Sequence, residues 1–101
     1  MQIRGKEVDF RVSRLKDAAA LELAINNMGK KEEEIRKEKT LTAAITKTNE
    51  MFCQFFIDAT GTDILDGCED LQESKEAYAE FLRAVGEQKK SILDFSVSEI
   101  K

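Results

Sequence analysis

The sequence predicts a mainly helical (α+β) fold, with a short N-terminal β-hairpin followed by three to four helices that include one long helix. Apolar residues recur at intervals of three and four through most of residues 13–90, the spacing of helices with one buried face. The opening residues instead alternate between apolar and polar, which is the period of a strand. A length of 101 residues allows one modest core, so we expect a single domain over residues 1–101.

Residues 1–12 are predicted to form the hairpin. Gly5 and Lys6 suit a two-residue turn that starts with glycine. The apolar positions around this turn are Ile3, Val8, Phe10 and Val12. Because a lone hairpin is barely stable in water, we expect it to lie on a helix or to pair with another chain.

The helical body, residues 13–90, begins with Ser13 as the expected N-cap of a first helix. Its buried face is predicted to contain Leu21, Ile25 and Met28, with Ala18 and Ala24 beside them. Gly29 either ends this helix or lies within it, because an interior glycine costs only about 1 kcal/mol relative to alanine.

The long helix is predicted from about residue 30 to residue 59. In the charged run 30–39, Glu32 precedes Arg36 by four residues, an arrangement that supports a solvent-exposed helix. The apolar stripe that follows contains Leu41, Ala44, Ile45, Thr48, Phe52, Phe55, Phe56 and Ala59. Such a helix would be about 45 Å long, wider than a compact domain of this size, so one end should project or pack on a second copy.

Residues 55–71 are predicted to join two helices. The stretch holds two glycines, a cysteine and five acids, which are Asp58, Asp63, Asp66, Glu69 and Asp70. Thr62 and Asp63 suit the cap of a short turn of helix that Gly67 closes. A calcium loop beginning at Asp58 would place Asp63 where glycine is required, so we expect a capped joint and no metal.

The last helix is predicted to begin after Asp70, which starts a capping box with Glu73. One face holds Leu71, Ser74, Tyr78, Phe81, Leu82 and Val85. The helix ends near Gly86 or continues to about Leu93. Residues 94–101 alternate again and are predicted to be a C-terminal tail or a short strand.

The composition offers few groups for catalysis. The chain has no histidine, and Cys53 and Cys68 are too few for a zinc site, so we expect them to be buried or partly buried thiols. No glycine-rich phosphate loop or hydrolase motif occurs. We therefore expect no enzyme activity, no catalytic residue, no metal and no cofactor.

The net charge of −4 is unevenly distributed: residues 1–16 carry +3 and residues 58–80 carry −7. Phosphate binding needs a continuous basic face, so we do not expect a nucleic-acid partner. A basic end and an acidic end would steer head-to-tail contacts between copies. The absence of an apolar run of roughly 20 residues or a signal sequence predicts a cytosolic protein without a membrane partner.

Helix caps, turn glycines and core aromatic residues together carry a family resemblance. They are Phe55, Phe56, Gly61, Thr62, Ile64, Leu65, Gly67, Leu71, Glu76, Ala77, Tyr78, Glu80 and Phe81. In this order, and with the opening IRGKEVDFRVSRLKDA, the chain resembles small proteins encoded among the tail genes of siphophages and prophages of Gram-positive bacteria. It departs from them at Asp70, where they often have asparagine, and at Tyr78, where they have phenylalanine.

The resemblance implies a tail assembly chaperone, which holds the tape-measure protein soluble until tail-tube subunits polymerise around it. Such a protein would be a non-enzymatic homo-oligomer in the cytosol of the bacterial host. The alternative is a general oligomeric helical interaction or scaffold protein of phage or bacterial origin, of which a virion component is a narrower variant.

Two apolar groups are candidates for binding a partner. The aromatic cluster is expected to be core rather than a peptide groove, and contains Phe52, Phe55, Phe56, Tyr78 and Phe81. The candidate partner-binding residues are Phe95, Val97 and Ile100 in the tail, whose alternation suits a strand that orders on a partner.

Overall fold

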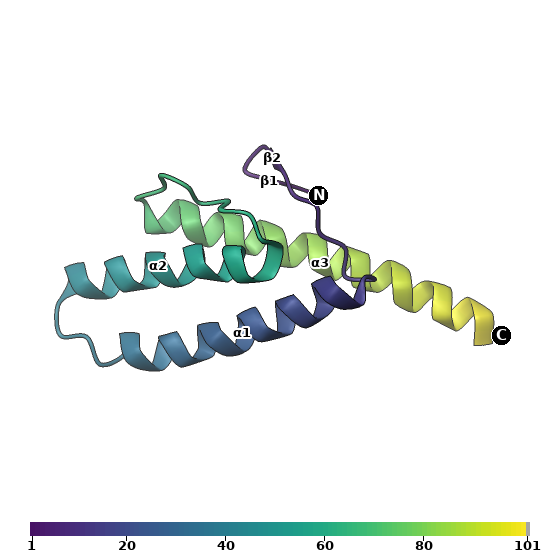
Figure 1. Cartoon of the computed structure of the whole chain (residues 1–101), viewed down its shortest axis with the longest axis horizontal. Coiled ribbons are helices and arrows are strands. Elements are labelled where there is room, and N and C mark those ends of the chain that lie inside the picture. Colours follow the sequence, from purple (N-terminus) through teal and green to yellow (C-terminus); the bar gives the residue numbers. More distant parts are fainter. Residues whose placement is uncertain (101) are drawn as a thin grey trace.

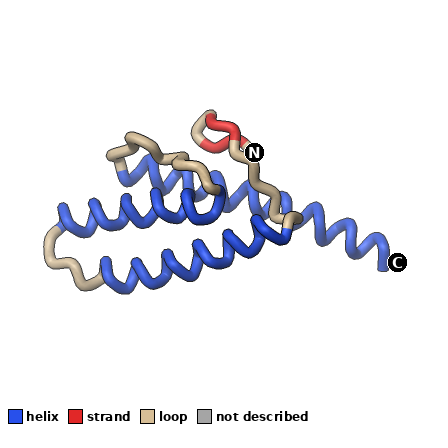
Figure 2. Tube along the Cα trace, viewed as in Figure 1, coloured by secondary structure: helices blue, strands red, loops and turns tan. Residues whose placement is uncertain are grey.

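The computed structural model describes the backbone of residues 1–100 and the side chains of residues 1–92. It contains a two-stranded antiparallel hairpin and three helices, which confirms the predicted fold class (Figures 1 and 2). The elements are β1 (Gln2–Ile3), β2 (Lys6–Glu7), α1 (Leu15–Ile35), α2 (Leu41–Thr60) and α3 (Leu71–Ile100).

Helix α2 is the central helix of the bundle. It packs on α1 on one side and on α3 on the other, and α1 and α2 form an antiparallel pair (Figure 1). The loop 61–70 returns along α2 before α3 begins, so α2 and α3 run in the same direction. Two contacts agree with this parallel direction. Asn49 is hydrogen-bonded to Ser74 and, further along both helices, Phe56 packs on Phe81.

The predicted helix from residue 30 to residue 59 is wrong, because the chain turns over residues 36–40. Gly29 lies inside α1, as one of the two sequence alternatives had it. Thr40 is the N-cap of α2, and its Oγ1 accepts a hydrogen bond of 3.2 Å from the Ala43 amide. An ion pair between Glu38 and Lys47 also joins the turn to α2. The long helix is instead α3, which has 30 residues and is about 45 Å long.

The hairpin turns one residue earlier than expected. Arg4 and Gly5 occupy the turn with φ of 54° and 75°, and Ile3 pairs with Lys6. Two consecutive positive φ values define a type I′ turn, whose twist matches that of the strands. The paired strands end at Glu7, so the hairpin is shorter than the predicted residues 1–12.

The hairpin contacts α3 through β1, as expected of a hairpin too small to be stable alone, and the segment after it also lies on α3. The Val12 amide donates to Gln88 Oε1 at 2.8 Å, and Gln88 Nε2 donates to the Phe10 carbonyl at 3.2 Å. The predicted cap Ser13 is wrong, since α1 begins after Arg14 without a side-chain cap. Asp17 in the first turn of α1 instead accepts a hydrogen bond of 2.9 Å from the Arg11 amide, which ties the preceding segment to the helix.

Aromatic rings form the centre of the core. The ring of Phe81 packs on those of Phe10, Phe55 and Phe56, with centroids 5.2, 5.8 and 5.6 Å away. The predicted aromatic cluster is therefore core, and Phe10 from the N-terminal segment completes it. Of the apolar positions predicted to lie on buried faces, four are instead exposed: Ile25 on α1, Leu41 and Ile45 on α2, and Leu82 on α3.

The acidic stretch between α2 and α3 is a capped joint. Gly61 ends α2 in the left-handed conformation (φ 74°), and its amide donates to the Ile57 carbonyl at 2.9 Å. Residues 64–67 form a hydrogen-bonded turn instead of the predicted short turn of helix. Asp70 Oδ1 accepts from the Gln72 amide at 2.9 Å, while Glu73 faces Arg4 at 4.0 Å instead of completing the capping box.

Residues 94–100 continue α3, so the prediction of a separate tail or strand is wrong, as are both predicted helix ends, near Gly86 and Leu93. The chain has no proline, and no glycine follows Gly86, so no strong helix-breaking residue follows it. The side chains of Phe95, Val97 and Ile100 lie outside the described residues.

Candidate protein-binding groove

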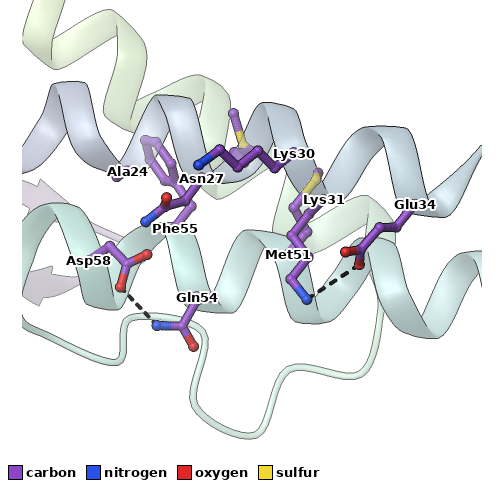
Figure 3. A pocket seen from close by; sticks show the side chains of 10 residues that line it. Ala24, Asn27, Lys30, Lys31, Glu34, Met51, Gln54, Phe55 and Asp58 are labelled. Atoms are coloured by element: carbon purple, nitrogen blue, oxygen red, sulfur yellow. Dashed lines mark hydrogen bonds and ion pairs between the residues drawn. The ribbon is translucent and has the colours of Figure 1, made fainter.

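A groove follows the seam between α1 and α2. Its volume is about 430 Å³. Side chains from two facing stretches, residues 24–34 of α1 and residues 51–58 of α2, line it (Figure 3). This size lies in the usual range of ligand-binding clefts.

Sulfur and aromatic groups form the floor of the groove. Met28 on α1 and Met51 on α2 are 9% and 7% exposed, and the Phe55 ring is 1% exposed beneath them. Met28 on α1 faces α2, and Met51 on α2 faces α1. Thioether side chains are unbranched and polarisable, so they adapt to apolar partners of different shape.

Charged and amide side chains form both rims. On α1, Lys31 Nζ lies 3.5 Å from Glu34 Oε2, and on α2 Gln54 Nε2 donates to Asp58 Oδ1 at 2.8 Å (Figure 3). Lys30 also lines the α1 rim. The rims therefore carry both signs of charge around an apolar floor.

The groove continues along the seam into a second hollow of about 250 Å³. The two hollows share Lys31, Glu34, Met51 and Gln54, and the second one extends along α2 as far as Lys47. From Lys47 to Asp58 the rise along α2 is about 16 Å, or three helical turns. A short amphipathic helix with an apolar stripe matches this length and this lining.

A polar junction holds α2 and α3 together on the other side of α2. The buried Ser74 hydroxyl donates to Asn49 Oδ1, and Asn49 Nδ2 donates to the Cys68 carbonyl at 3.0 Å. Cys68 Sγ lies 3.4 Å from Ser74 Oγ. Each of these polar side chains thus has partners within the fold, as buried polar groups require.

Two titratable groups near this junction have shifted pKa values. Burial, followed by the charges of Asp63 and Cys68, raises the pKa of the Cys53 thiol. Burial also raises the pKa of Tyr78, with a smaller effect of Glu32 in the same direction. Both shifts favour the neutral form, so Cys53 is a protonated thiol near neutral pH and not an activated nucleophile.

The sequence-predicted partner residues and the groove lie in different parts of the fold. Phe95, Val97 and Ile100 belong to the last turns of α3, while α1 and α2 form the groove. Sequence reasoning placed Met28 on a buried face but did not select Met51 or the seam. The available signal was the pair of methionines on neighbouring helices, since methionine is frequent at adaptable binding surfaces.

The arrangement defines a small three-helix protein with an N-terminal hairpin and a methionine-lined groove. The sequence matches no protein-family model, and neither the curated proteins nor the solved structures compared with it gave a match. Within residues 1–100, no helix has the length and apolar content needed to cross a membrane. Nor do three or more potential metal ligands come together among the described side chains.

Proposed function

We propose that this chain is a non-enzymatic tail assembly chaperone that binds an amphipathic helical segment of the tape-measure protein in the α1–α2 groove. The observation that carries the proposal is the methionine floor formed by Met28 and Met51 between rims of mixed charge. An adaptable apolar floor suits a chaperone, which must hold a helix without selecting one side-chain shape. The resemblance to phage tail-region proteins supplies the identity of the partner.

The dimensions of the groove support a helical partner. Its three turns along α2 accommodate a partner stripe of apolar residues at positions i, i+3 or i+4, and i+7. The rim charges of Lys30, Lys31 and Asp58 would lie beside the polar flanks of such a helix. Binding of this kind buries a modest area and is reversible, which a chaperone needs in order to release its client when the tail tube polymerises.

Site-specific photocrosslinking tests the proposal. A benzophenone amino acid replaces Gln54, an exposed rim residue, in the tagged chain within cells that produce the parent phage or prophage. We expect crosslinks to the tape-measure protein, identified by mass spectrometry. The chaperone hypothesis also predicts that the chain is missing from purified phage particles.

A matched control places the same amino acid at Arg83, an exposed position of α3 outside the α1–α2 seam. It should give no tape-measure crosslink. Equal capture from both positions would contradict binding in the groove. Capture of other partners from Gln54 would favour the general scaffold role, and recovery of the chain from purified particles would favour a virion component.

A further inference from the structure

Helices α2 and α3 are staggered along their common direction. Ser74 in the first turn of α3 lies opposite Asn49, nine residues into α2, and Phe81 lies opposite Phe56. Both pairs have an offset of 25 residues, so Leu71 at the start of α3 corresponds to residue 46 of α2. The first turns of α2 consequently have no α3 beside them.

The uncovered part of α2 is apolar, and we call residues 41–45 the ledge. Leu41 and Ile45 are 76% and 39% exposed. They precede the buried Phe52 by eleven and seven residues, spacings that place all three on one side of a helix. That side packs on α3 further along, because Phe52 contacts the Tyr78 ring with centroids 5.1 Å apart. The ledge is therefore a continuation of the core face that lacks its cover.

The opposite end of the molecule has the complementary feature. The bonds between Gln88 and the N-terminal segment lie near the end of the bundle, and α3 continues beyond it to Ile100 (Figure 1). We call residues 93–100 the overhang. The overhang is about 12 Å long and the ledge about 8 Å, so the overhang is long enough to cover the ledge.

We propose that the overhang of one copy lies on the ledge of the next copy, in line with that copy's own α3, so that copies join head to tail. This inference does not depend on the α1–α2 groove or on its client. The stagger itself defines the occupant, since the missing cover of the ledge is a helix running parallel to α2. The overhang is a helical segment of this kind at the other end of the protein.

Charge favours this pairing over contacts between like ends. Residues 36–47, which contain the turn before the ledge, hold four bases and one acid. The overhang holds Asp94 and Glu99 and no base, although Lys101 follows it in the sequence. Glu99 lies in the last turn of α3, where the helix dipole disfavours negative charge. A neighbouring basic turn would relieve that repulsion, whereas two overhangs or two ledges would bring like charges together.

A head-to-tail contact leaves a free ledge at one end of every assembly and a free overhang at the other. Such contacts form open chains, or rings where the rotation closes. The expected behaviour is therefore growth beyond a dimer as the protein concentration rises. Sedimentation equilibrium of the full chain over a wide concentration range measures this growth. A mass that stays at the monomer, or that reaches a plateau at the dimer, would overturn the proposal.

Two full-length variants locate the contact. Leu41→Glu with Ile45→Glu alters the ledge, and Val97→Asp with Ile100→Asp alters the overhang. We expect each double variant alone to be monomeric where the unmodified chain is assembled, an increase in apparent dissociation constant of at least tenfold. Leu23→Glu is the matched control, since Leu23 is 59% exposed on α1 away from both surfaces, and it should assemble normally.

Mixing the two double variants gives the decisive result. The ledge variant retains its overhang and the overhang variant retains its ledge, so the mixture should form a one-to-one dimer that grows no further. Circular dichroism checks that both variants stay folded. A contact between like ends predicts instead that one of the two variants still dimerises by itself, because each keeps one intact end. That outcome, or a mixture that remains monomeric, would refute the head-to-tail arrangement.

Discussion

Replacing Phe81 by alanine removes the ring at which the N-terminal segment, α2 and α3 meet. Phe81 is fully buried and packs edge to face on Phe10, Phe55 and Phe56. Truncation of a buried phenylalanine to alanine costs about 3–5 kcal/mol through lost transfer energy and the cavity left behind. Domains of this size are stable by only about 5–15 kcal/mol, so the variant should lose a large share of its stability.

Urea denaturation followed by circular dichroism at 222 nm measures the loss. The matched control is Leu82→Ala at the next position of α3, where the side chain is 39% exposed and its truncation should cost less than about 1 kcal/mol. A double-mutant cycle with Phe10→Ala should give a coupling energy of about 0.5–1.5 kcal/mol for the pair of rings. If Phe81→Ala and Leu82→Ala destabilise equally, or if the coupling is zero, the described core is incorrect.

Three further experiments test the contacts that hold the helices in place and the burial of Cys53. Asn49→Ala removes the acceptor of the buried Ser74 hydroxyl and the donor to the Cys68 carbonyl, so it should lower the free energy of unfolding by about 1–3 kcal/mol in the same denaturation assay; no loss would mean that the junction is not formed. Thr40→Ala removes the cap of α2 and should cost about 1 kcal/mol, with Thr42→Ala as an exposed control expected to cost less. Because burial raises the pKa of Cys53, its alkylation by iodoacetamide should require a higher pH in the folded chain than in urea, as followed by mass spectrometry; equal pH profiles would contradict the burial.

The same shift makes stability depend on pH. The folded-state pKa of Cys53 is raised, so the unfolded chain loses the thiol proton at a lower pH than the folded chain does. The stabilising contribution is therefore complete below the ordinary thiol pKa and is lost as the pH rises through the folded-state value.

Helical periodicity made most of the fold predictable. The stripe containing Phe52, Phe55 and Phe56 lies in the core as expected, because a three-four spacing defines one face whichever partner covers it. The ends of the helices were harder to predict. The break before α2 depends on one threonine cap against a run of good helix formers, and local propensity alone did not decide between them.

The groove could not be derived from periodicity, since it depends on how α1 and α2 meet. The sequence predicted a buried face for Met28, but not that its side chain and that of Met51 line a common hollow. The exposed Leu41 and Ile45 illustrate the same limit. Their spacing is that of core residues, and only the offset between α2 and α3 leaves them uncovered.

The docking of the N-terminal segment on α3 sets the order in which the newly made chain completes its core. The bonds from Gln88 to Phe10 and Val12 join residues 78 and 76 positions apart, whereas α1 and α2 are neighbours in sequence. Contacts between distant residues form late, and synthesis proceeds from the N-terminus. Ile3, Val8 and Phe10 are made first but become buried only after α3 has left the ribosome.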